Sequence, residues 1–129
     1  MTFYLYAGEQ MVGTSELPGA DPPMGFVCGP FYPNPNYARI QPLIREAHLY
    51  DGSLGASSEE ALKRVQHKID ALNLKIKTST CETLQPVGGV HLTDFSEEIE
   101  EIQLGVFGLP EDTITTYWKD EYDLYYNGE

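Results

Sequence analysis

The chain has 129 residues, of which 41% are hydrophobic, and a formal net charge of −12. This length and hydrophobic content predict a single globular domain, residues 1–129, and exclude a chain that stays disordered for lack of apolar side chains. No apolar run is long enough to span a bilayer and no signal peptide is recognisable at the start, so we expect a cytoplasmic protein.

The first half of the chain is predicted to be mostly strand and loop. In "FYLYAGEQMVGTSE" two β-rich runs flank the turn-forming "AGEQ", which predicts a hairpin. The proline- and glycine-rich "LPGADPPMG" is predicted to be a loop. "GFVCGPFY" predicts another strand, and "NPNYARIQPLIREAHLYDG" predicts two short helical pieces because Pro42 interrupts a continuous helix.

The clearest helix signal covers about residues 57–72. Ser57 and Glu60 form a capping box at its start. Apolar residues then recur at spacings of three and four, which places them on one helical face: Leu62, Val65, Ile69 and Leu72. The basic residues between them are expected to face solvent: Lys63, Arg64 and Lys68. The segment is therefore predicted to be an amphipathic helix.

Strands are predicted again after this helix. "NLKIKTST" alternates apolar residues with lysines, and "LQPVGGVHLTDF" has a similar pattern around a glycine pair. "IEEIQLGVFG" is also predicted to be a strand, although a helix beginning in "SEEIEE" is an alternative. Strands thus outnumber helices without regular alternation. We expect an α+β fold: a largely antiparallel β-sheet packed by one long amphipathic helix (about 57–72) and one or two short helical pieces.

The C-terminal segment "EDTITTYWKDEYDLYYNGE" is predicted to be a hairpin with "KDE" as its turn. A helix over "EDTITTYW" is the alternative. In the hairpin, the core face would carry Trp118, Tyr122 and Tyr126. The opposite face would carry Tyr117, Asp123 and Tyr125.

The negative charge is concentrated in the last part of the chain. Residues 94–129 contain eleven Asp or Glu and a single base, Lys119, whereas residues 1–93 contain nine acids and seven bases. Such an asymmetry indicates an interacting face or tail. Double-stranded nucleic acid is not expected as a direct ligand, because phosphate binding needs clustered Lys and Arg.

Catalytic and metal-binding motifs are not recognisable in the sequence. His48, His67 and His91 lack the spacing of metal ligands, and the glycine-rich stretches do not match a phosphate-binding loop. Cys28 and Cys81 are expected to be reduced and buried, with no catalytic role. We therefore expect neither an enzyme nor a bound cofactor or metal.

The acidic and aromatic C-terminus remains as the candidate site. Tyr and Trp are favoured interface anchors, and surrounding carboxylates steer a cationic partner. The partner-binding residues predicted from the sequence are Asp112, Tyr117, Asp120, Glu121, Asp123 and Tyr125. Trp118 and Tyr122 are further candidate anchors. The alternative to a binding site is an edge hairpin with a purely structural role, whose acids face water.

These features favour an acidic binding protein that inhibits a basic partner. The most concrete form is a bacterial immunity or antitoxin protein that neutralises a basic, nuclease-like toxin by direct complex formation. One alternative is a DNA mimic that blocks a nucleic-acid-binding enzyme. Another is a small enzyme or ligand-binding module with "LPGADPPMGFVCGPFYP" as a lid over Tyr32, Tyr37 and His91.

Overall fold

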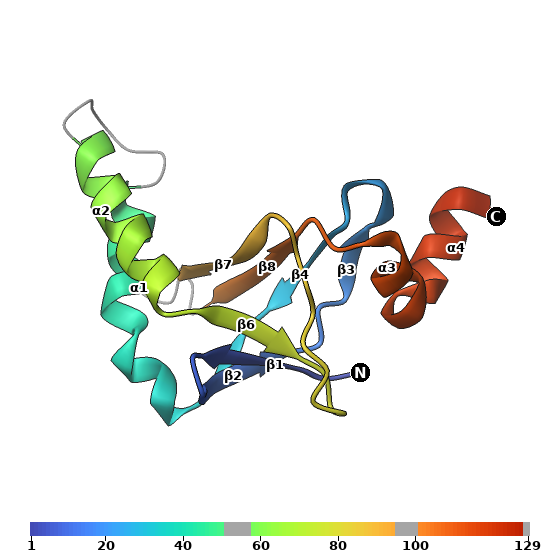
Figure 1. The fold of residues 1–129 in the computed structure, drawn as a ribbon, viewed down its shortest axis with the longest axis horizontal. Coiled ribbons are helices and arrows are strands. Elements are labelled where there is room, and N and C mark those ends of the chain that lie inside the picture. The colour runs from blue at the N-terminus through green and yellow to red at the C-terminus, as the bar shows by residue number, and fades with distance from the viewer. Residues whose placement is uncertain (51–57, 95–100, 128–129) are drawn as a thin grey trace.

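The computed structural model describes residues 1–50, 58–94 and 101–127. In these residues the fold is α+β, with two four-stranded antiparallel sheets and four helices of at least seven residues (Figure 1). The predicted class and the antiparallel pairing are confirmed. The single sheet and the single dominant helix are wrong, because the strands divide between two sheets and the helices lie at both ends of the molecule.

The first sheet contains the predicted N-terminal hairpin. Its strand order is β5-β2-β1-β6, and all its pairs are antiparallel. The strands are β1 (Phe3–Ala7), β2 (Gln10–Ser15), β5 (Tyr32–Pro33) and β6 (Leu74–Lys77). The hairpin and the "NLKIKTST" strand are therefore confirmed.

The second sheet has the order β3-β4-β8-β7. Its strands are β3 (Gly19–Asp21), β4 (Phe26–Pro30), β7 (Gly89–Asp94) and β8 (Ile102–Phe107). The predicted loop "LPGADPPMG" is partly wrong, since it contains β3 and a 3₁₀ helix, η1 (Pro22–Met24). Gly25 permits this tight connection: its φ is 62°, and a Cβ there would lie 2.5 Å from the Leu109 oxygen.

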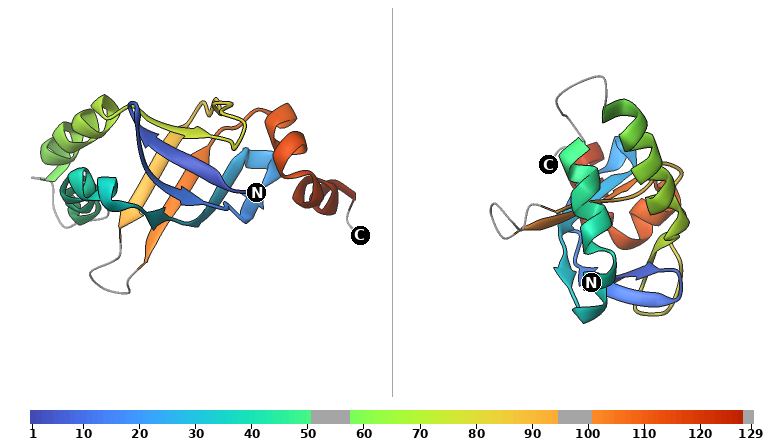
Figure 2. Two further views of the ribbon diagram at one scale, coloured as in Figure 1. Left: turned by 90° about the horizontal axis from the view of Figure 1, so that it is seen from below. Right: turned by 90° about the vertical axis from the view of Figure 1, so that its left-hand side faces the viewer.

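The hydrophobic core lies between the inner faces of the two sheets, whose strands run in crossing directions (Figure 2). Alternation supplies its side chains: β1 contributes Phe3 and Leu5, and β8 contributes Leu104 and Val106, all at most 2% exposed. The two ends of this double layer are closed by helices (Figure 2).

One helical end consists of η2 (Pro35–Arg39), α1 (Gln41–Tyr50) and α2 (Ser58–Ala71). Helices η2 and α1 confirm the two predicted helical pieces, and the Asn34 side chain caps η2 by accepting a hydrogen bond from the Asn36 amide at 2.9 Å. Helix α2 packs against α1. Val65 of α2 is buried, as predicted.

The predicted faces of α2 are confirmed where its side chains are described. Ile69 and Leu72 are half-buried against the core, and three basic residues are exposed: Lys63, Arg64 and Lys68. Ser57 of the capping box and the side chain of Leu62 lie outside the described residues.

The predicted C-terminal hairpin is wrong. The segment forms two consecutive helices, α3 (Glu111–Tyr117) and α4 (Lys119–Asn127), so the helical alternative holds over "EDTITTY" and extends further. Ile114, Trp118 and Tyr122 are four residues apart, a spacing that puts side chains on one side of either a strand or a helix. The acids in the first turn of both helices favour the helix, because they lie near the positive end of its dipole.

Both cysteines are free thiols in the structure, but the expected burial is wrong for Cys81. Cys28 is half-buried on β4, whereas Cys81 is exposed in the turn after β6. Its positive φ of 67° holds it in that turn.

Candidate interaction surface on the C-terminal helices

Helices α3 and α4 are fixed to the body of the protein by Trp118, the residue between them. Its side chain is 3% exposed, and its ring stacks on Phe3 of β1 with the centroids 4.9 Å apart. Its indole Nε1 donates a hydrogen bond to the buried Leu17 carbonyl at 2.9 Å. Ile114 of α3 is buried in the same core. The two helices are therefore a docked part of the fold.

Tyr117, a predicted contact residue, also helps to hold this end in place. Its ring packs edge-on against Phe3, with centroids 6.0 Å apart, and its hydroxyl donates a hydrogen bond to Glu82 at 2.9 Å. That hydrogen bond is the main cause that raises the pKa of Tyr117. Tyr117 is therefore already engaged within the protein.

Three tyrosines of α4 form a continuous aromatic cluster, which we call the tyrosine cluster: Tyr122, Tyr125 and Tyr126. The ring centroids are 4.6 Å apart for Tyr122 and Tyr126, and 5.0 Å apart for Tyr125 and Tyr126. Tyr122 packs against the core and donates a hydrogen bond to Glu111 at 3.1 Å, which raises its pKa. The predicted core position of Tyr126 is wrong, since the helix turns it outward.

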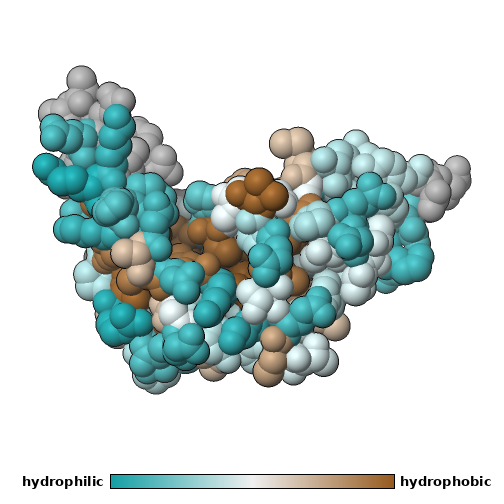
Figure 3. All heavy atoms as spheres, viewed as in Figure 1, coloured by the Kyte–Doolittle hydropathy of each residue, from teal (hydrophilic) through white to brown (hydrophobic). Residues whose placement is uncertain are grey.

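The outer side of α4 exposes three consecutive large side chains. Leu124, Tyr125 and Tyr126 are 64%, 58% and 53% exposed. Helix α4 projects from one end of the molecule (Figure 1) and packs on β3 and η1, where Met24 is also exposed. On the visible face this end is pale to teal in Figure 3, as expected for tyrosines among acids. The exposed surface of α4 therefore combines aromatic rings with charged groups, which distinguishes it from a purely aliphatic hydrophobic patch.

The predicted acids are distributed over both helices. Asp120 and Glu121 lie in the first turn of α4, and Asp112 is exposed in the first turn of α3. Asp123 accepts a hydrogen bond from Lys119, with Oδ2 and Nζ 2.6 Å apart, and this contact raises the pKa of Lys119. Four of the six predicted residues therefore lie on α4 and two on α3.

A buried polar cluster lies elsewhere, around Asp94 at the end of β7. Its carboxylate accepts hydrogen bonds from the Tyr37 hydroxyl at 2.8 Å and from Gln41 Nε2 at 3.1 Å, and Arg45 Nε lies 3.6 Å away. Burial is the first cause that raises the pKa of Tyr37. These contacts join η2 and α1 to the second sheet. This cluster was not predicted from the sequence, although Asp94 is an acid at an inward-facing position of a strand, β7.

The residues proposed to lie beneath a proline-rich lid are dispersed. Tyr32 lines a pocket near the start of α1, Tyr37 is buried against Asp94, and His91 lines a smaller pocket beside α2. A Cys/His nucleophilic pair would need a hydrogen bond between the two side chains. His91 and Cys28 lie opposite Gly105 on the two strands that flank β8, so their Cα atoms are about two strand spacings or ~10 Å apart, too far for that hydrogen bond. Among the described residues, no group of three or more His, Cys, Asp or Glu could hold a metal ion.

No protein-family model, curated protein or solved structure matches the chain. Within the described ranges, no helix is both long and apolar enough to cross a membrane.

Proposed function

We propose that the chain is a binding protein that docks helix α4 on a basic surface of another protein. The observation that carries the proposal is the exposure of Leu124, Tyr125 and Tyr126, each more than half exposed, on a helix whose other side is docked on the core. Clustered exposed apolar side chains are typical of interaction sites, and Tyr is a favoured anchor there.

The charge around this cluster supports a cationic partner. Residues 111–127 contain five acids and one base, and that base, Lys119, is already paired with Asp123. Such a carboxylate frame attracts Lys- and Arg-rich surfaces and repels acidic ones. The exposed tyrosine rings can also receive cationic groups on their faces.

More specifically, we propose that the chain is an inhibitor. Its most concrete form is a bacterial immunity or antitoxin protein that neutralises a basic, nuclease-like toxin by direct complex formation. A nuclease needs positive charge to hold its phosphate-rich substrate, so its surface fits the charge of α4. Electrostatic steering would give the fast association that protection of a cell requires.

The kinetic test uses the partner that co-purifies with the chain from its native host. Replacing Tyr125 by Ala should raise the dissociation rate constant about tenfold or more, as for an interface anchor. Val87→Ala is the control, because Val87 is the most exposed of the described large apolar residues and lies outside α3 and α4.

Circular dichroism should show that both variants are folded. Equal dissociation rates for the parent and the Tyr125→Ala protein would overturn the proposal. If DNA of any sequence displaced the partner at low salt but not at raised salt, the DNA-mimic alternative would replace it.

A further inference from the structure

A second candidate site lies where one extended segment leaves the second sheet and joins the first. The segment runs from β4 into β5, with Phe31 between them turned into the core and Tyr32 turned outward. The Phe31 amide donates a hydrogen bond to the Ile102 carbonyl at 2.8 Å, which holds this crossover against the start of β8. Gly13 of β2 allows the close approach, because a Cβ there would lie 2.3 Å from the Phe31 ring.

The crossover forms a pocket of about 340 Å³ on the protein surface. Five of its lining residues are apolar or aromatic: Pro30, Phe31, Tyr32, Pro33 and Ile102. Gln41, at the start of α1, and Glu101 complete the lining. The volume lies near the lower end of the range of about 300–1,000 Å³ typical of ligand pockets, so the pocket suits one small group.

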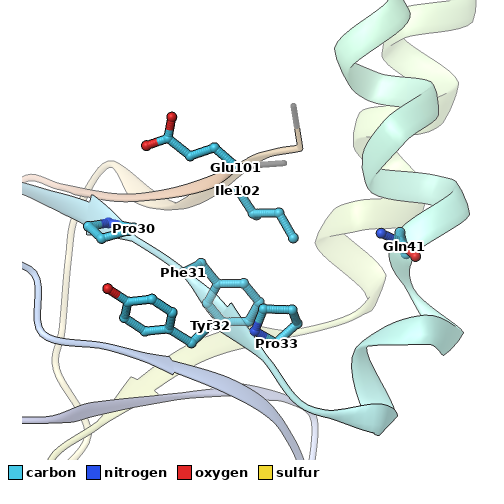
Figure 4. Close-up of a pocket in the computed structure, with 7 residues that line it drawn as sticks. All are labelled: Pro30, Phe31, Tyr32, Pro33, Gln41, Glu101 and Ile102. Carbon is cyan, nitrogen blue, oxygen red and sulfur yellow. The ribbon is translucent and has the colours of Figure 1, made fainter. Parts of the chain in front are cut away.

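The polar chemistry of the pocket favours a cation. Glu101 is the one charged residue among the described residues that line it. Figure 4 shows the Glu101 carboxylate and the Tyr32 ring on opposite sides of the opening, toward its Pro30 end. Glu101 accepts a hydrogen bond from Gln103 Nε2 and, as a carboxylate, has further acceptor positions. A positive group held between an aromatic face and a carboxylate can interact with both.

The solvent exposure of the pocket indicates whether the positive group belongs to a small molecule or to a side chain of another protein. Tyr32 is 57% exposed, so the opening leaves one wall in contact with solvent. Small-molecule sites usually enclose most of their ligand. A side chain that projects from another protein needs only a shallow, open receptor of this kind.

We propose that this pocket binds the side chain of an arginine presented by a protein partner. The planar guanidinium can stack on Tyr32 while it pairs with the Glu101 carboxylate, and the aliphatic stem can pack along Pro30 and Ile102. A lysine ammonium cannot stack in this way and pairs with a carboxylate through a single point charge. The pocket therefore distinguishes the two cations.

This inference does not rest on the function proposed for α4. The pocket borders α1, which lies at the opposite end of the molecule from α4 (Figure 1). The test uses the isolated full chain and a short peptide, so its failure would leave the α4 proposal standing.

The experiment is a nuclear magnetic resonance titration of the isotopically labelled chain with the capped peptide acetyl-Ala-Arg-Ala-amide. Shifts should localise to Tyr32, Glu101 and Ile102. Matched peptides carry lysine or citrulline, the neutral isostere, in place of arginine. The arginine peptide should bind about tenfold more tightly than the citrulline peptide, since citrulline lacks the charge for ion pairing and cation–π contact.

Two substitutions separate the contributions of the carboxylate and the ring. Glu101→Gln and Tyr32→Leu should each weaken binding of the arginine peptide by about twofold to fivefold. Glu111→Gln, which neutralises an acid on α3, is the matched control and should have no effect.

Several outcomes would overturn the inference. These are equal binding of the citrulline or the lysine peptide, shifts confined to α4, binding unchanged by Glu101→Gln, and tighter binding of free L-arginine than of the capped peptide. The last would point to a small-molecule site instead of a protein-presented side chain.

Discussion

At the scale of single residues, the buried carboxylate of Asp94 is a polar position where one substitution should destabilise the fold. Asp94 is 3% exposed. Its carboxylate accepts hydrogen bonds from Tyr37 and Gln41 and lies near Arg45, and these three residues come from two neighbouring helices. Asp94→Ala leaves the buried Tyr37 hydroxyl without its acceptor, and an unsatisfied buried polar group typically costs about 1–3 kcal/mol. Urea unfolding should show a decrease of that size in the free energy of unfolding.

The exposed pair of Lys119 and Asp123 is the natural control for this effect. Both side chains are accessible to solvent, which screens their attraction. Asp123→Ala should therefore shift the urea midpoint far less than Asp94→Ala does. Equal shifts in the two variants would mean that burial does not decide the contribution of a carboxylate in this protein.

At the scale of elements, the docking of the C-terminal helices depends on Trp118. Trp118→Ala removes the ring that stacks on Phe3 and the donor to the Leu17 carbonyl. Truncating a buried Trp typically costs about 3–5 kcal/mol. Hydrogen exchange should show faster amide exchange across residues 111–127, since α3 and α4 lose their anchor.

A subtler variant tests the hydrogen bond alone. Trp118→Phe keeps an aromatic ring against Phe3 but removes the indole donor, and a buried acceptor left unsatisfied costs about 1–3 kcal/mol. Tyr125→Ala, on the exposed side of α4, should leave exchange in α3 unchanged. If Trp118→Ala exchanged like the parent protein, the helices would be held by other contacts.

The same helices show where sequence patterns stop being sufficient. The N-terminal hairpin was predictable because its strands are neighbours in sequence and its turn residues are explicit. In α3, the β-branched run from Thr113 to Thr116 favours a strand by local propensity, yet burial of Ile114 and Trp118 selects the helix. A spacing of four residues fits both a strand and a helix, and tertiary packing decided in favour of the helix.

Non-local pairing limits prediction of the sites in a similar way. Strand β1 pairs with β6, and β4 with β8, across about half of the chain, so two sheets could not be told from one by periodicity. The pocket proposed to bind arginine is lined by both Tyr32 and Glu101, and the pairing of β4 with β8 brings these distant parts of the chain together. By contrast, five of the six predicted contact residues lie within nine positions of one another, so local charge and composition were enough to propose them without knowledge of the fold.

At the scale of the whole molecule, the negative charge is unevenly distributed between the two ends. Helix α2 at one end has three bases (Lys63, Arg64 and Lys68) and three acids, whereas α4 at the other end has three acids and one base (Figure 1). Such an uneven distribution orients an approaching basic protein toward α4 before contact. Screening weakens this guidance, because the Debye length falls to about 10 Å at 0.1 M salt.

Neutralising the acids of α4 should therefore slow association more than it speeds dissociation. We expect Asp120→Asn, Glu121→Gln and Asp123→Asn together to lower the association rate constant about tenfold at low salt and to flatten its salt dependence, since rim charges act mainly on encounter. The matched control neutralises Lys63, Arg64 and Lys68 to Gln, the same number of charges at the other end. That variant is more acidic overall and should associate with a basic partner at least as fast as the parent. If both triple variants associate like the parent at every salt concentration, the acids of α4 are a solvated face and do not guide a partner.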